Sequence, residues 1–286
     1  MNQDPGRLAQ ELVASSTDIP SLPDIYLRIR TILQDPASSH QDVADALGTD
    51  PGITARLLKM ANSAFYGRPG SIDTIGRAVG LLGTQQVHDL VLATTLISAF
   101  QGYSTAPLDP RQFWYTSVLA GTGSKLLAEH CGILDCERLF VAGLLAQIGQ
   151  LLIARDRPVE MTELLQTAGD SGETIDALQQ SRLGFDYADV SVELFTQWQL
   201  PEDLIAPIRW HTRLGDHADD GLEASILQIA IRCATQPTQG LDTVLSQIDD
   251  RAWTLTGLSL EELNRLFAEA VELTDGLAPI LLDNAA

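Results

Sequence analysis

Cysteine is scarce in this sequence of 286 residues, and no two cysteines form a CxxC pair. The three present are Cys131, Cys136 and Cys233. An odd and small number of cysteines argues against the disulfide framework of small secreted domains. We therefore expect inert thiols and a reducing compartment, the cytoplasm.

Basic residues and long apolar runs are also in short supply. Lys and Arg number 18 against 38 Asp and Glu, which gives a net charge of -20. Such a charge repels phosphate backbones and anionic lipid. No apolar run approaches the roughly 18 residues that span a membrane, and residues 1–5 lack the pattern of a signal peptide. We expect neither a membrane nor a nucleic acid among the partners.

The acidic charge is unevenly distributed. Residues 1–105 have a net charge of -3, whereas residues 106–286 have -17. The near-neutral part is where an anionic partner would dock.

Alternating strand patterns are almost absent, and helix patterns recur along the whole chain. Asp50 and Pro51 illustrate a helix start, because Asp caps the first turn and Pro loses no hydrogen bond at the first helical position. The sequence predicts an all-α fold, with helices at about 24–33, 40–47, 51–63, 72–82, 84–100, 113–131, 137–154, 158–168, 172–182, 186–198, 201–212, 222–236 and 259–273.

The segment 137–154 is apolar on nearly every face, which predicts a buried central helix. Its run AGLLAQIGQ at 142–150 resembles the metal-binding segment of HD-superfamily phosphohydrolases, in which Gly-Leu-Leu is followed by His-Asp and Ile-Gly-Lys. In those enzymes the His-Asp pair holds a metal ion that acidifies the attacking water. Ala146 and Gln147 stand in its place here. Alanine has no donor atom, and glutamine is a poor ligand for a transition metal.

The other ligand positions that this resemblance implies are substituted as well, except for one histidine. A catalytic metal needs about three protein ligands, so we expect no metal, no cofactor and no catalytic residue. The vestigial positions are Thr116, Ala146, Gln147, Tyr187, His211, Thr212 and Ile231.

The first part of the chain resembles the HDOD family, the HD-related output domains of bacterial signalling proteins. The resemblance rests on the Asp-Pro helix start, on LLKMANSAFY at 57–66 and on AVGLLG at 78–83. It covers about residues 20–235. It implies an all-α fold with an N-terminal helical bundle packed on an HD-like bundle, and a role in signal transduction, usually without catalysis.

Residues 102–110 are the best candidate for a boundary, because they contain Gly, Ser, Thr and two prolines without apolar periodicity. They divide an N-terminal subdomain, 1–105, from an HD-like subdomain lacking metal ligands, 106–286. The aromatic residues near this boundary are candidate anchors for a partner protein, or core residues: Tyr103, Phe113, Trp114 and Tyr115.

Several residues in the first subdomain are candidates for binding. Asn62, Ser63 and Tyr66 belong to the family motif, and could bind a ligand or tie down the following loop through side chain-to-backbone hydrogen bonds. A second group could bind a phosphate-bearing messenger such as a cyclic dinucleotide, although spaced charges are more often simply solvated: Arg56, Lys59, Arg68 and Arg77.

Two further features have a functional and a structural interpretation. Gln147 and Gln150 share one face of the predicted buried helix, and could line a vestigial pocket for an uncharged ligand or satisfy loop backbone groups. His217 lies in the acidic segment 216–220, whose spacing does not match a calcium-binding loop, so we expect a solvated loop.

We predict a non-catalytic output or adaptor module of bacterial signalling that binds other signalling proteins. One alternative is a residual phosphohydrolase with atypical ligands, which the ligand count opposes. Another is a nucleic-acid-binding regulator, because residues 43–60 resemble a helix-turn-helix. The second helix of such a motif would enter the major groove. Its basic residues here are only Arg56 and Lys59, whereas DNA-binding proteins usually present a basic face.

Overall fold

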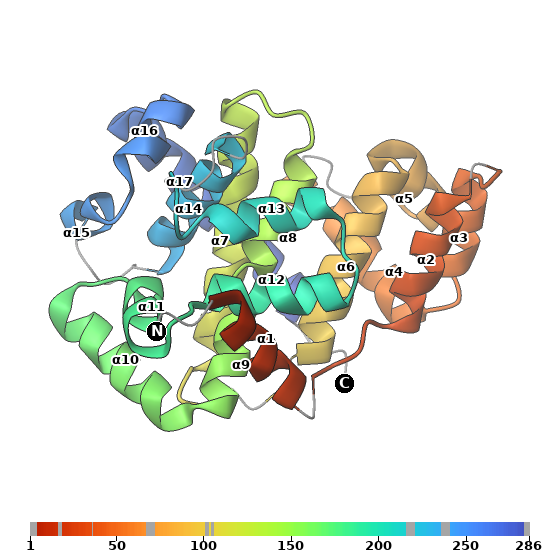
Figure 1. The fold of residues 1–286 in the computed structure, drawn as a ribbon. Coiled ribbons are helices and arrows are strands. Elements are labelled where there is room, and N and C mark those ends of the chain that lie inside the picture. The colour runs from red at the N-terminus through yellow and green to blue at the C-terminus, as the bar shows by residue number, and fades with distance from the viewer. Residues whose placement is uncertain are drawn as a thin grey trace. The chain divides into compact units, whose positions relative to one another are not determined.

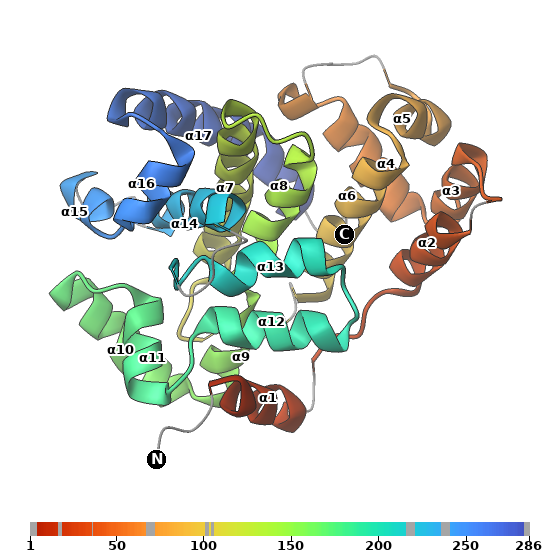
Figure 2. The same cartoon turned by 45° about the horizontal axis from the view of Figure 1, so that its top comes forward.

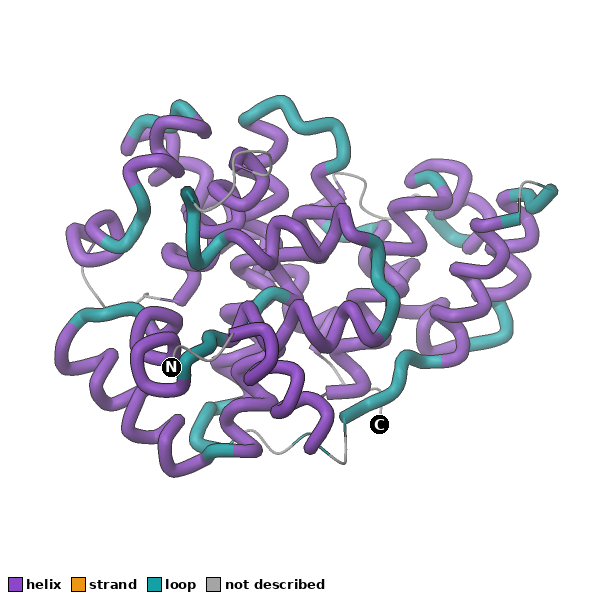
Figure 3. Tube along the Cα trace, in the orientation of Figure 1, coloured by secondary structure: helices purple, strands orange, loops and turns teal. Residues whose placement is uncertain are grey.

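The computed structural model describes residues 5–16, 19–35, 37–66, 72–100, 103, 106–215, 221–235 and 241–282. Within these ranges the chain forms helices joined by loops, and no strand is present (Figure 3). The predicted all-α fold is confirmed. The helices are α1 Pro5–Ser15, α2 Asp24–Gln34, α3 His40–Leu47, α4 Pro51–Ala61, η1 Ala64–Tyr66, α5 Ile75–Leu82, α6 Thr84–Phe100, α7 Pro110–His130, α8 Cys136–Leu145, α9 Ile148–Asp156, α10 Pro158–Ser171, α11 Ile175–Leu183, α12 Tyr187–Gln197, α13 Glu202–Trp210, α14 Gly221–Thr235, α15 Leu241–Ser246, α16 Asp250–Thr256 and α17 Leu260–Leu282.

The chain divides into two compact units, and neither is continuous in sequence. The larger unit contains residues 1–19 and 104–270, and the smaller unit contains residues 20–103 and 271–286. The expected division at residue 105 therefore differs from the observed one at both ends of the chain. The first 19 residues join the larger unit because α1 packs against α9 and α12.

In the smaller unit, α6 contacts α2, α4 and α5, while α3 packs on α2 and α5 (Figure 1). Nearly every side chain of α6 from Val87 to Ile97 is buried, as expected for a helix without a polar face. The start of α4 is as predicted, since the Asp50 side chain accepts a hydrogen bond from the Ile53 N–H and Pro51 is the first helical residue.

In the larger unit, α7 and α8 pack at very short range, and α14 lies against α7. A Cβ atom at Gly121 would be 2.7 Å from the Phe140 carbonyl oxygen, and one at Gly143 would be 2.7 Å from the Ala120 carbonyl oxygen. Only glycine allows two backbones to approach so closely. Helices α12 and α13 lie side by side in the same unit (Figure 2).

The predicted central helix is interrupted, so the prediction of one continuous helix over 137–154 is wrong at Ala146 and Gln147. The Ser191 hydroxyl donates to the Ala146 carbonyl and accepts from the Gly149 N–H, both at 2.8 Å. Both backbone groups would otherwise bond within the helix. Helix α8 therefore ends at Leu145 and α9 begins at Ile148.

One segment of the described chain, Cys136–Asp156, is long and apolar enough to cross a membrane by length and composition. It consists of α8 and α9, and 94% of its apolar window is buried inside the protein. This segment is accounted for as the core of the larger unit.

Candidate functional site

A cavity of about 300 Å³ lies in the larger unit, among α7, α9, α10, α11, α12 and α14. Four of the vestigial metal-site positions line it: Thr116, Gln147, Tyr187 and Ile231. Ala146, His211 and Thr212 do not line it. Sequence positions far apart in the chain therefore meet at one hollow.

His211 has both ring nitrogens engaged within the protein. Its Nδ1 lies 2.7 Å from the Ile208 carbonyl oxygen, and its Nε2 lies 2.9 Å from the Tyr187 hydroxyl. Because a carbonyl oxygen only accepts, Nδ1 carries the proton and Nε2 accepts from the phenol. Burial lowers the pKa of His211 to about 4, so the ring is neutral at pH 7. Tyr187 thus occupies the nitrogen lone pair that a metal ion would need.

The remaining vestigial positions offer little to a metal. Ala146 and Ile231 have no donor atom, and the Thr212 hydroxyl donates to the Asp186 carboxylate at 3.0 Å. The Thr116 hydroxyl accepts from the Gln112 amide at 3.3 Å. Over the ranges that the structure describes, no group of three or more His, Cys, Asp and Glu side chains is placed to share a metal ion.

Gln147 and Gln150 are paired, as their spacing of three residues allows. The Gln150 Nε2 donates to the Gln147 Oε1 at 2.9 Å. The Gln147 Nε2 is buried and has no hydrogen-bond partner among the described residues. The two side-chain amides therefore form one hydrogen-bonded pair in the cavity lining. The Gln147 Nε2 is the donor of this pair that has no acceptor among the described residues.

A buried ion pair beside the cavity was not anticipated from the sequence. Arg232 lines the cavity and binds the Asp176 carboxylate through both terminal nitrogens, at 2.6 and 2.7 Å. Burial works to raise the pKa of Asp176, but the Arg232 guanidinium outweighs it and leaves that pKa lowered. The signal in the sequence was a single arginine within the mainly apolar segment 224–234.

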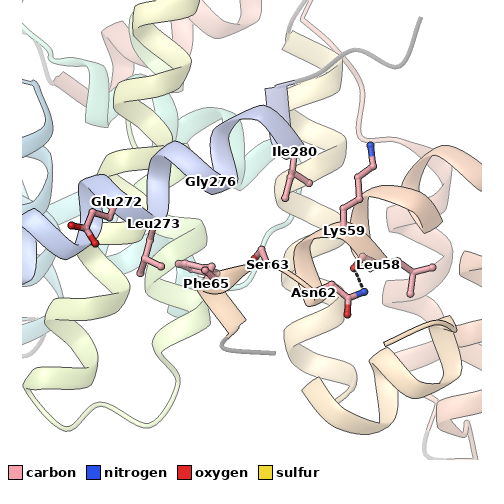
Figure 4. A pocket seen from close by; sticks show the side chains of 10 residues that line it. Leu58, Lys59, Asn62, Ser63, Phe65, Glu272, Leu273, Gly276 and Ile280 are labelled. Carbon is pink, nitrogen blue, oxygen red and sulfur yellow. Dashed lines mark hydrogen bonds between the residues drawn. The ribbon is translucent and has the colours of Figure 1, made fainter. Parts of the chain in front are cut away.

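A second, more open hollow lies in the smaller unit beside the family motif (Figure 4). It encloses about 470 Å³, and α4 with its following turn faces the last part of α17 across it. Its lining residues include Lys59, Asn62, Ser63 and Phe65 from the motif, and Glu272, Leu273, Gly276 and Ile280 from α17.

The motif residues at this hollow bond mainly to the chain's own backbone. The Asn62 Nδ2 donates to the carbonyls of Leu58 and Ile72, at 2.9 and 2.6 Å, and its Oδ1 accepts from the Ile72 N–H at 2.9 Å. The Ser63 hydroxyl donates to the Met60 carbonyl at 2.6 Å. Tyr66 is half-buried and does not line the hollow. Asn62 therefore holds the chain at Ile72 against the end of α4.

The other candidate residues are dispersed. The Arg56 guanidinium donates to the Ser98 hydroxyl, and Arg77 pairs with Asp73 at 2.9 Å. Arg68 and His217 lie outside the described residues. Of the boundary aromatics, Tyr103, Phe113 and Trp114 are buried and Tyr115 is half-buried.

The thiols have no activating surroundings. Burial raises the pKa of Cys233 to about 12, and burial with nearby carboxylates raises that of Cys136 to about 11. Thiols with such pKa values stay protonated at neutral pH, whereas nucleophilic cysteines need the thiolate.

Comparison with known proteins identifies relatives of this arrangement. The HDOD domain family matches residues 19–214. An uncharacterised protein of Treponema pallidum (strain Nichols) is 23% identical over 270 residues, which are 93% of this chain and 51% of that protein. The chain thus spans about half the length of the curated relative it matches.

Solved structures share the fold. An HDOD domain protein of unknown function from Geobacter sulfurreducens is 24% identical, with a TM-score of 0.76 over 96% of this chain and 98% of that one. A provisionally assigned phosphohydrolase from Shewanella amazonensis SB2B is also 24% identical, with a TM-score of 0.74 over 96% and 97%. A provisionally assigned signal transduction protein from Marinobacter aquaeolei VT8 is 19% identical, with a TM-score of 0.70 over 98% and 66%. Because these sequence identities are all below 25%, the structural similarity establishes a shared fold and no more.

Proposed function

Because this chain belongs to the HDOD family, we propose that it is a non-catalytic output module of bacterial signalling. It acts in the cytoplasm by binding another signalling protein. A solved relative of similar fold is described as a signal transduction protein, which supports the signalling role.

The observation that carries the proposal is the hydrogen bond from the Tyr187 hydroxyl to the Nε2 of His211. His211 is the one imidazole left among the vestigial positions, and this bond takes its free lone pair. A hydrolytic metal needs about three protein ligands and an open position for water. The neighbouring positions supply a methyl group at Ala146, an amide at Gln147 and an aliphatic side chain at Ile231.

The second candidate is a residual phosphohydrolase. One observation favours it, since a relative of the same fold is provisionally assigned that activity. Only the metal chemistry separates the two candidates, because both use the same scaffold.

The test is the metal content per chain, measured by elemental analysis of untagged protein purified without chelator. We expect far less than one iron, manganese or zinc per chain. The same preparation, with Mn²⁺ added, should not hydrolyse bis(p-nitrophenyl) phosphate or a cyclic dinucleotide faster than the His211→Ala variant does. Stoichiometric metal, or hydrolysis that the His211→Ala variant lacks, would refute the non-catalytic proposal.

A further inference from the structure

Two residues that line the cavity of the larger unit each have a buried hydrogen-bond donor without a partner among the described residues. The donors are the Nε2 of Gln147 and the Nε of Arg232. The two residues expose only 4% and 6% of their surface. A buried donor left without an acceptor destabilises the folded state. Two such donors in the wall of one cavity favour a ligand that supplies hydrogen-bond acceptors.

The surrounding hydrogen bonds fix which atoms are offered. Gln150 donates to the Oε1 of Gln147 at 2.9 Å, so Gln147 presents its Nε2 hydrogens. Each terminal nitrogen of Arg232 donates to the Asp176 carboxylate, and its Nε has no partner among the described residues. A ligand that satisfies these donors brings hydrogen-bond acceptors, such as carbonyl oxygens or ring nitrogens.

The charges around the cavity disfavour an anion. The Asp176 carboxylate neutralises the charge of Arg232. Two exposed carboxylates, Asp109 and Glu173, also belong to the lining, and the whole chain has a net charge of -20. Like charges repel across such a site, so the acceptors belong to an uncharged molecule.

The size and the walls restrict the ligand further. About 300 Å³ is the lower end of the range for small-molecule pockets. Part of the wall is apolar and is formed by Leu108, Phe113, Leu165 and Ile175. A small molecule with an apolar body and polar groups on one side matches this mixed lining.

We propose that this cavity binds a small uncharged amide or lactam, whose acceptor atoms take the Gln147 Nε2 and Arg232 Nε hydrogens. Four of the vestigial metal-site positions line this cavity, so the inference rests on the proposed absence of a catalytic metal. Binding would give the signalling module an input of its own.

The test is calorimetric titration of the full chain with two matched pairs of probes at millimolar concentrations. Nicotinamide and uracil are the neutral probes, and nicotinate and orotate are their carboxylate counterparts. We expect at least one neutral probe to bind, and its carboxylate counterpart to bind about tenfold or more weakly. A tenfold difference corresponds to about 1.4 kcal/mol.

Three variants locate the binding. Gln147→Leu should weaken the binding of the probe about tenfold or more, because it removes one of the two hydrogen-bond donors. Gly169→Phe should weaken binding, because Gly169 lines the cavity and a Cβ there meets nothing within 4 Å, so a larger side chain can be added at the cavity wall. Gln197→Leu is the control, since Gln197 is exposed and outside the lining, and should bind as the wild type does.

Each other result overturns the inference. Failure of both neutral probes to bind excludes the ligand class, and equal binding of a carboxylate counterpart excludes the charge argument. Unchanged binding in Gln147→Leu and Gly169→Phe places the probe elsewhere; should Gln147→Leu not fold, Gly169→Phe decides. Elemental analysis of the same protein separates the two proposals: stoichiometric metal refutes the proposed function, whereas a metal-free chain that binds no probe refutes only this inference.

Discussion

At the scale of single residues, the pairing of Tyr187 with His211 determines what the imidazole can still bind. A histidine at position 187 would add a second nitrogen ligand, as the HD resemblance implies. The tyrosine instead brings a hydroxyl that donates to the His211 Nε2 at 2.9 Å. The buried imidazole is then satisfied without an ion, because each of its nitrogens has one partner.

His211 gives the folded state a pH-dependent stability. Burial lowers its pKa from 6.5 to about 4, so between these values the unfolded chain binds a proton that the folded chain does not. Its contribution is fully present above about pH 6.5 and is lost as the pH falls towards 4. From pH 7 to pH 5 we expect a loss of about 2 kcal/mol in unfolding free energy from this group, measured by urea denaturation.

The His211→Gln variant is the control for this prediction, because glutamine does not titrate. Between pH 7 and pH 5 the variant should lose about 2 kcal/mol less than the wild type. Asp186 titrates in the opposite direction, since burial raises its pKa to about 6, but it is present in both proteins and cancels in the comparison. An identical pH dependence of the unfolding free energy in the two proteins would contradict the assignment of this effect to His211.

At the scale of elements, most helices could be predicted, and the exceptions have physical reasons. Helices α3 and α6 have the bounds that their apolar periodicity predicts, His40–Leu47 and Thr84–Phe100. The break between α8 and α9 was not predictable from periodicity, because it depends on Ser191, which lies more than 40 residues away. Helix α1 was missed although Ala9, Leu12 and Val13 have helical spacing and are buried.

The candidate site was only partly predictable for the same reason. The pairing of Gln147 with Gln150 is local, and a spacing of three residues was enough to anticipate a shared face. The Tyr187–His211 and Asp176–Arg232 contacts join residues 24 and 56 positions apart. Their partners depend on how α11, α12, α13 and α14 pack, which no local pattern specifies.

The contact between α9 and α12 predicts the effect of one methyl group. A Cβ atom at Gly149 would lie 2.1 Å from the Tyr187 carbonyl oxygen and 2.9 Å from the Ser191 backbone nitrogen. Gly149→Ala should therefore lower the unfolding free energy by about 3 kcal/mol or more, since overpacking forces the backbones apart. Thermal or urea denaturation followed by circular dichroism measures this loss.

Gly169 provides the matched control on α10. A Cβ atom there meets nothing within 4 Å, and alanine favours a helix interior over glycine by about 0.5–1 kcal/mol. Gly169→Ala should stabilise the protein by an amount of that order. Similar effects of the two alanines would show that the close approach at Gly149 has been overestimated.

At the scale of the whole molecule, residues 271–286 belong with residues 20–103, although most of the chain separates them. In this part of α17, Leu277 and Leu281 are completely buried. Each buried leucine contributes about 1.5–3 kcal/mol. Truncation after Ala270 should therefore destabilise the smaller unit by about 3–6 kcal/mol.

Hydrogen exchange followed by mass spectrometry measures this effect unit by unit. Peptides from α2 to α6 should lose protection in the truncated chain, while those from α7 to α9 should keep most of theirs, because local stability follows cooperative units. Equal loss in both units, or no loss in either, would contradict the assignment of residues 271–286 to the smaller unit.

The division into two units also constrains how such a chain can be inherited. Its path passes from one unit to the other three times, after residues 19, 103 and 270. A recombination crossover between two related genes, at most points between residues 19 and 270, would therefore produce a protein in which at least one unit combines core residues from both parent sequences. Since core side chains must fit one another closely, such hybrids would be selected against. The module is thus expected to spread between genes as one indivisible segment, with its first and last helices together.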